Sequence, residues 1–222
     1  MMIRNAIKSL SPTRPVFHSE ADFQHALAWA VHLMEPDAEV RIEVPSYSSD
    51  SRRYLDLVVR HGDSQIGIEL KYKTRMLLAE TPKDTFFLED QSAQDLGRYD
   101  FFKDIERLEQ FVAGDATRVG IAVFLTNDSA YWKPPGRPTV GYGQFAMTEG
   151  RIASGELIWQ EGAGEGTRKN RESAIRLAGS YLVTWNEYSI LQCKLPRASG
   201  GYGRFRYAIA EVGQLTPRPT TS

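Results

Sequence analysis

Apolar residues recur with a helical period early in the chain. They fall three or four residues apart, at Phe23, Leu27, Val31 and Met34. This spacing predicts a helix that begins at Ser19 and ends before Pro36. Ser19 and Asp22 form a pattern similar to a capping box, which supports the start of the helix at this point.

Short apolar runs bounded by turn residues follow. Three of them are typical of strands, namely Glu39–Val44, which Pro45 bounds, Tyr54–Arg60 and Gln65–Lys73. The last two flank His61-Gly62-Asp63-Ser64, which favours a tight hairpin turn. Helical spacing returns over Gln91–Val112, and Val119–Leu125 is a nearly all-apolar run typical of a central strand. The order α-β-β-β-α-β predicts an α/β fold with a mixed sheet flanked by helices.

The remaining segments carry weaker patterns. Pro12 and Pro15 would break a helix in residues 1–18, so we expect a short leader there, and residues 74–90 read as a loop. In the second half we expect a short helix over Arg171–Ala178, strands over Tyr181–Leu191 and Phe205–Val212, and a polar tail over Leu215–Ser222. The simplest organisation is a single domain over residues 1–222, with a core at about 19–126 and an insertion with additional strands at 127–222.

Composition excludes several classes of protein. The 222 residues include 27 Lys and Arg against 28 Asp and Glu, a net charge of −1, so nucleic-acid binding through an overall basic surface is excluded. No apolar run approaches the roughly 20 residues of a membrane span, and the N-terminus lacks the apolar region of a secretory signal. Cys193 is the single cysteine and cannot form an intramolecular disulfide. We therefore expect a cytoplasmic protein without a membrane partner.

The triplet Glu69-Leu70-Lys71 lies in the third predicted strand. Alternation along Gln65–Lys73 places Glu69 and Lys71 on one face, opposite the apolar residues. With Gly62-Asp63 as a two-residue loop, the hairpin register places Asp56 directly opposite Glu69, with Cβ atoms about 4.5–5.5 Å apart. Two carboxylates in this arrangement repel each other, unless one has a raised pKa or a cation binds between them.

Two interpretations of this cluster stay open. A carboxylate pair beside a lysine suits a Mg²⁺-dependent phosphodiester hydrolase. The alternative is an Asp–Lys–Glu surface network on an exposed sheet face. Glu20 is a further candidate because it lies on the helix face that packs on the sheet, although a first-turn acid also complements the helix dipole. We expect Gln24, one turn later, to lie on the same face of the helix, toward the sheet.

Together these elements and residues resemble the PD-(D/E)XK nuclease superfamily, which has a restriction-endonuclease-like αβββαβ core. The resemblance implies that Asp56, Glu69 and the Leu70 carbonyl bind Mg²⁺, with Mn²⁺ as a substitute. It further implies that Lys71 orients or activates the attacking water and that Glu20 ligates a metal directly or through water. Leu55 stands where the superfamily often has proline, and Gln94 and Tyr99 are five residues apart, unlike the Gln-x-x-x-Tyr motif of the RecB-like branch. The branch is therefore unassigned.

Basic and amide side chains flank the candidate site. Those expected to contact nucleic acid or phosphate are Lys73, Arg75, Gln94 and Arg98. For Arg98, an Arg–Asp pair on a solvated helix face is an equal alternative.

The expected function is that of a metal-dependent nuclease that hydrolyses phosphodiester bonds, with DNA as the substrate, in a restriction, repair or mobile-element context. A homodimer is compatible with the resemblance. The alternative is a catalytically silent nuclease-fold module that binds nucleic acid or a protein partner. A hydrolase of another phosphoester would use the same metal chemistry.

Overall fold

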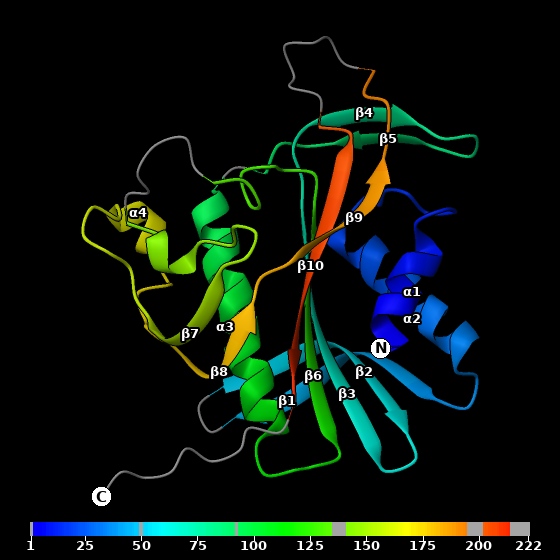
Figure 1. Ribbon diagram of the computed structural model, residues 1–222. Helices are drawn as coiled ribbons and strands as arrows, with labels where there is room; N and C mark the ends of the chain where they lie inside the picture. Colours follow the sequence, from blue (N-terminus) through cyan, green and yellow to red (C-terminus); the bar gives the residue numbers. More distant parts are fainter. Residues whose placement is uncertain (1, 49–50, 92, 135–140, 195–201, 214–222) are drawn as a thin grey trace, which may run out of the picture.

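A six-stranded mixed sheet forms the centre of the computed structural model, which describes residues 2–48, 51–91, 93–134, 141–194 and 202–213. The strand order is β1-β2-β3-β6-β10-β9 (Figure 1). Its strands are β1 (Glu39–Ser48), β2 (Ser51–His61), β3 (Ser64–Lys73), β6 (Arg118–Thr126), β9 (Trp185–Ile190) and β10 (Arg204–Val212). The pair β3 and β6 is parallel and the other neighbours are antiparallel. An α/β fold with a mixed sheet is thereby confirmed.

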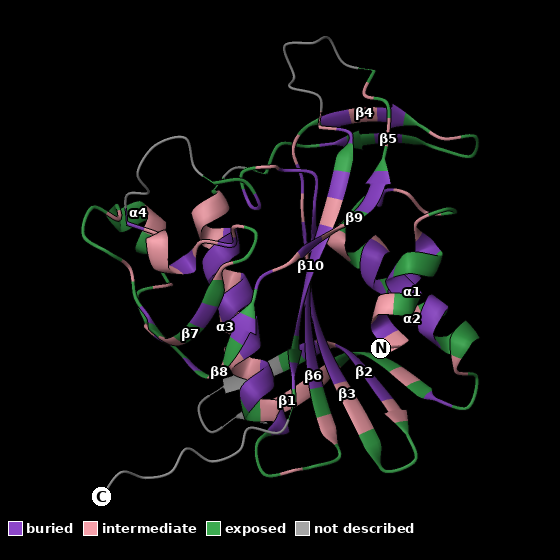
Figure 2. Cartoon of the chain, in the orientation of Figure 1, coloured by how far each residue is buried: buried purple, intermediate pink, exposed green. Residues whose placement is uncertain are grey.

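Helices cover both faces of this sheet (Figure 1). Helices α1 (Met2–Leu10) and α2 (Glu20–Met34) lie on one face. The other face carries α3 (Gln94–Val112) together with the two-stranded sheet of β7 (Ile152–Leu157) and β8 (Ile175–Leu182). Figure 2 shows that burial is concentrated along the strands between these layers.

Successive side chains of the central strands point alternately to the two faces of the sheet, so these strands contribute to the hydrophobic core on each face. In β6, Val123 and Leu125 pack toward α1 and α2, whereas Ala122 and Phe124 pack toward α3. Successive side chains of a strand point to opposite faces, so a run that is apolar throughout can serve two cores. This is why Val119–Leu125 reads as a central strand from its sequence.

The N-terminal segment differs from its expectation as a leader. Residues Met2–Leu10 form α1, and Ile3 and Ile7 are completely or almost completely buried against the sheet. Pro12 follows the helix rather than breaking it. Pro45 likewise lies inside β1, which continues to Ser48. A proline is tolerated there because β1 is an edge strand of the sheet, where one side of the backbone has no ladder partner.

Two further segments also differ from their expectations. Residues 74–90 contain a hairpin of β4 (Leu77–Glu80) and β5 (Thr85–Leu88) instead of a continuous loop. The second half of the segment Arg171–Ala178 begins the strand β8, because Ile175 and Leu177 are buried with strand rather than helical spacing. The short elements of the second half are a 3-10 turn at Gly143–Phe145 and α4 at Glu165–Arg168. The polar tail Leu215–Ser222 lies outside the described residues.

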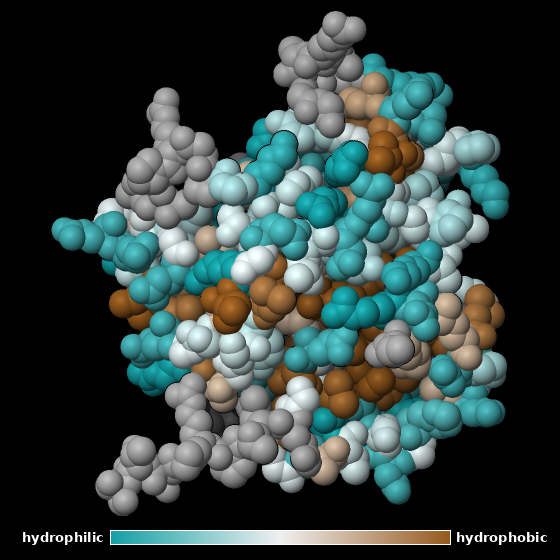
Figure 3. Space-filling view, in the orientation of Figure 1, coloured by the Kyte–Doolittle hydropathy of each residue, from teal (hydrophilic) through white to brown (hydrophobic). Residues whose placement is uncertain are grey.

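The surface mixes hydrophilic and hydrophobic areas (Figure 3). Large apolar side chains reach solvent at several points, including Trp29 and Leu33, one turn apart on α2, and Ile190 at the end of β9. None of the helices in the described part of the chain combines the length and apolar character that crossing a membrane requires.

Candidate functional site

The candidate site lies where β2 and β3 separate. The hairpin has the expected register, from His61 opposite Ser64 to Leu57 opposite Ile68, and Gly62 in its turn has a φ of +56°. Beyond Ile68, β3 remains paired with β6 as far as Lys73, but within the described residues its pairing with β2 has ended. The backbone groups of β3 that faced β2 are therefore left without a ladder partner.

Two carboxylates occupy this free edge of β3. Oδ2 of Asp56 accepts a hydrogen bond from the backbone N–H of Leu70 at 2.6 Å, and Oε2 of Glu20 accepts one from the N–H of Tyr72 at 2.7 Å. The Lys71 ammonium turns to the same edge and donates to the Leu70 carbonyl at 3.0 Å. The pairing of β2 with β3 has ended at this point, and the hydrogen bond from the Leu70 N–H holds the Asp56 carboxylate beside β3.

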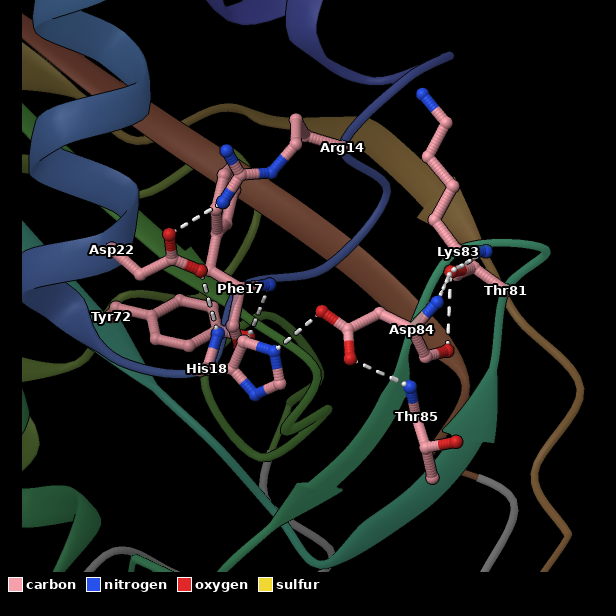
Figure 4. A network of polar contacts seen from close by, with 9 residues as sticks. All are labelled: Arg14, Phe17, His18, Asp22, Tyr72, Thr81, Lys83, Asp84 and Thr85. Atoms are coloured by element: carbon pink, nitrogen blue, oxygen red, sulfur yellow. Dashed lines mark hydrogen bonds and ion pairs between the residues drawn. The ribbon is translucent and has the colours of Figure 1, made fainter.

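Local contacts at the start of α2 explain how Glu20 reaches β3. The Ser19 side chain caps the helix by accepting from the Asp22 N–H, and Arg14 forms an ion pair with the Asp22 carboxylate. The Tyr72 hydroxyl donates to the Phe17 carbonyl at 2.9 Å, which joins the preceding segment to β3 (Figure 4). Glu20 is the first residue of a helix that is fixed to the strand it contacts.

The β4–β5 hairpin supports the same segment from the other side. His18 Nε2 lies 3.2 Å from Oδ2 of Asp84, and the His18 ring stacks on Phe86 with centroids 4.3 Å apart. In Figure 4 the His18 side chain points from the α2 start toward the Asp84 turn. The inserted hairpin therefore helps to place the N-terminus of α2.

Gln24 fixes the backbone at Asp56. Its Nε2 donates to the Asp56 carbonyl at 2.7 Å and to Oε1 of Glu43 at 3.2 Å. Glu43 has a φ of +52°, a left-handed conformation that costs a non-glycine residue about 1–3 kcal/mol. The regular β1–β2 ladder is interrupted at this residue, between Ile42–Leu57 and Val44–Leu55. Asp56 thus lies where the pairing of β2 is irregular on both sides, with β1 and with β3.

Helix α3 contributes two side chains that the sequence interpretation missed. Oδ2 of Asp104 lies 2.8 Å from the Lys71 ammonium. Arg107 Nη2 lies 2.8 Å from Oε1 of Glu69 and 2.6 Å from Oδ1 of Asp104. The available signal was an acid–base pair three residues apart beside the apolar positions Ile105 and Leu108 of the same helix.

The pKa directions in this cluster reflect burial for the two acids and neighbouring carboxylates for the two cations. Burial raises the pKa of Asp56, and burial together with the Asp104 carboxylate raises the pKa of Glu69 to about 9. Burial lowers the pKa of the Lys71 ammonium, but Asp104 and Glu20 outweigh it, so the net shift is upward. The pKa of Arg107 is raised in the same way. Both cations are therefore held in their charged form.

The same cluster has the ligand chemistry of a divalent cation site. Its four acids, Glu20, Asp56, Glu69 and Asp104, face two cations, Lys71 and Arg107, which leaves a surplus of two negative charges when all are ionised. Oε1 of Glu69 and Oδ2 of Asp104 are buried without an aligned hydrogen bond, although a cation lies near each. Carboxylate oxygens are the ligands that Mg²⁺ prefers.

The positions of these acids do not form a ready cage. Among the described residues, no group of three or more His, Cys, Asp or Glu side chains is arranged to hold a metal ion. The reason is visible in their contacts, since Asp56 and Glu20 accept from backbone N–H groups and Glu69 contacts Arg107. A cation at Oε1 of Glu69 would have to replace the Arg107 contact.

Three of the residues expected to contact phosphate, Arg75, Gln94 and Arg98, have their partners outside this cluster. Arg75 pairs with Asp90 at 2.7 Å, and Gln94 donates to Oδ2 of Asp128 at 2.9 Å. Lys73 is half-buried at the end of β3.

Arg98 is the clearest departure from these expectations. It is only 4% exposed, donates to the Ala130 carbonyl at 2.6 Å and stacks on the rings of Tyr131 and Tyr142. It does not lie on a solvated helix face, and its guanidinium is engaged inside the fold.

Comparisons of the chain with family models, with curated proteins and with solved structures find no significant match.

Proposed function

We propose that this protein is a Mg²⁺-dependent nuclease with a restriction-endonuclease-like core, acting on DNA. The observation that carries the proposal is the convergence of Glu20, Asp56 and the Glu69–Lys71 strand at the free edge of β3. They come from α2, β2 and β3, and strands that separate beside a buried acid create a polar opening within an otherwise apolar sheet. The element order from α2 to β6, with the β4–β5 hairpin inserted, supports the same core.

The metal ligands in this proposal are Asp56, Glu69 and the Leu70 carbonyl, with Glu20 acting directly or through water. All are oxygen ligands, and the acids of the cluster outnumber the two cations beside them, which suits a divalent cation. When bound, Mg²⁺ or Mn²⁺ would polarise the scissile phosphate and lower the pKa of a bound water.

Lys71 acts as a charged donor in this proposal. Because the neighbouring acids raise its pKa, the ammonium stays protonated near neutral pH and can orient a water or hold a phosphate oxygen. Asp104 is a positioning residue, since its carboxylate fixes the Lys71 ammonium at 2.8 Å. Glu20 and Gln24 also fix the backbone of the strands that carry the ligands, Glu20 at Tyr72 of β3 and Gln24 at Asp56 of β2.

One observation favours a second candidate, a catalytically silent module of the same fold that binds nucleic acid. Arg107 already supplies a cation to Glu69. If that ion pair is permanent, the acids are part of a structural network and no metal enters.

The test is incubation of single-stranded and duplex DNA and RNA with the protein in Mg²⁺, Mn²⁺ or EDTA. We expect cleavage of DNA with either metal and none with EDTA. Asp56→Asn should remove the activity, whereas Asp37→Asn, a change at an exposed acid outside the cluster, should keep it. Binding of nucleic acid without cleavage in either metal would support the silent module, and neither binding nor cleavage would overturn both candidates.

A further inference from the structure

A cavity of about 310 Å³ opens directly beside the candidate site. It lies between α3 and the β1–β2 part of the sheet and runs along the α3 face of β3, from Gln65 past Gly67 to Glu69. Glu69 and Arg107 line it and also belong to the acid cluster. Whatever fills the cavity therefore contacts the Glu69–Arg107 side of the candidate site.

The lining of the cavity carries more positive than negative side chains. Among the described residues that line it, Arg60, Arg107 and Arg118 stand against one carboxylate, that of Glu69. Arg60 and Arg118 are tied to Glu39 and Asp115 through exposed or half-exposed ion pairs, which cost little to exchange. Nε of Arg107 is buried without a hydrogen-bond partner among the described residues. Such a lining favours an anionic ligand.

The walls between these cations are apolar and aromatic. Leu55, Val58 and Phe111 form them. Phe111 lies against Gly67, where a Cβ atom would stand 2.8 Å from the ring, and the Arg118 guanidinium covers the ring at 5.2 Å. A planar, uncharged ring is the group that such walls accept best.

Two amide side chains also line the cavity, Gln65 from β3 and Gln110 from α3. An amide both donates and accepts hydrogen bonds, as the edge of a nucleobase requires. The volume lies at the lower end of the roughly 300–1,000 Å³ of ligand pockets, which fits one nucleotide and excludes a duplex.

We infer that this cavity takes one unpaired nucleotide of the strand to be cut, with the base against its apolar and aromatic walls and its phosphates toward the arginines. This inference rests on the proposed function and narrows it. The substrate is then a single strand, an end or a duplex with an extruded base, because only an unpaired base can enter.

Binding in EDTA tests the inference without cleavage. The probe is a single-stranded oligonucleotide that contains 2-aminopurine, compared with the same strand in a duplex. We expect tighter binding of the single strand and a severalfold change in 2-aminopurine fluorescence. Val58→Phe, which fills the cavity, and Gln110→Ala, which removes an exposed amide from a helix, should each weaken single-strand binding by about tenfold. Gln160→Ala, at an exposed glutamine elsewhere, should change it less than twofold.

The outcomes separate this inference from the proposed function. If Val58→Phe does not fold, Gln110→Ala carries the comparison. Equal affinity for duplex and single strand, with no effect of Gln110→Ala, overturns the inference even when metal-dependent cleavage is observed. Binding that depends on the cavity, with no cleavage in Mg²⁺ or Mn²⁺, supports the inference and overturns the nuclease.

Discussion

The Asp56 carboxylate has two roles at the free edge of β3, since it satisfies the Leu70 N–H and adds to a surplus of negative charge. The two roles can be separated by Asp56→Asn, which keeps an acceptor oxygen and removes the charge. In the wild type, Mg²⁺ at about 100 times its dissociation constant should stabilise the fold by about 2.7 kcal/mol, a rise of roughly 5–10 °C in Tm. Thermal unfolding of Asp56→Asn should show little of this rise, and a metal-free Tm no lower than that of the wild type. An undiminished metal shift in the variant would place the metal elsewhere.

Arg107 is the residue that metal entry would displace from Glu69. Arg107→Ala leaves two buried acids without this partner, so the metal-free variant should lose on the order of 1–3 kcal/mol of unfolding free energy. Mg²⁺ should recover more of that stability in the variant than it adds to the wild type, because the cation then has no competitor. Urea unfolding with and without Mg²⁺ measures both quantities. Equal metal effects in the two proteins would mean that Arg107 and the cation do not share a position.

How far these residues could be predicted depends on how far apart in the sequence the residues that contact each other are. The common face of Glu69 and Lys71 and the approach of Asp56 follow from strand alternation and a two-residue turn, both of which are local. Asp104 and Arg107 come from α3, and their contact with β3 depends on how that helix crosses the sheet. No sequence spacing relates the two elements, so they could not be assigned in advance.

Among the elements, the β2–β3 hairpin decides the geometry of the site. A slip of one residue in its register would move Asp56 to the opposite face of the sheet. Gly62 fixes the turn with its φ of +56°, and no atom lies within 4 Å of a Cβ placed there. The requirement for glycine at this position is therefore conformational and not steric.

Gly62→Ala should accordingly destabilise the protein by about 1–2 kcal/mol, the cost of a left-handed conformation for a residue with a side chain. Gly166→Ala is the matched control, because Gly166 lies in α4, has space for a Cβ and is not among the glycines with positive φ. Chemical denaturation should show no loss for the control. Equal stabilities of the two variants would contradict the role assigned to the turn.

The elements that sequence patterns missed have identifiable causes. The prolines after Leu10 end α1 without preventing it, and the burial of Ile3 and Ile7 stabilises a helix that is short in isolation. In β8, the alternation of Ile175 and Leu177 spans too few residues to distinguish a strand from a helix by sequence alone. Pairing with β7 determines the strand.

At the scale of the whole molecule, the order of strands and helices between α2 and β6 was predictable apart from the inserted β4–β5 hairpin, because each of the other elements has a strong period of its own. In the second half, the strand expected over Phe205–Val212 is confirmed as β10, whereas β7 and β8 were missed because packing on α3 stabilises them rather than their own pattern. The arrangement nevertheless brings one polar opening and one cavity to the same side of β3.

The central claim is that the cluster at the free edge of β3 cuts phosphodiester bonds, and Lys71→Ala tests it most directly. Single-turnover cleavage of DNA at saturating protein in Mg²⁺ should be at least about a hundredfold slower in the variant, because loss of one positioned charged donor at the reacting atoms costs roughly 10²–10³ in rate. Lys8→Ala, at an exposed lysine of α1, should cleave at the wild-type rate. Equal rates for Lys71→Ala and the wild type, or no cleavage by the wild type, would contradict the account.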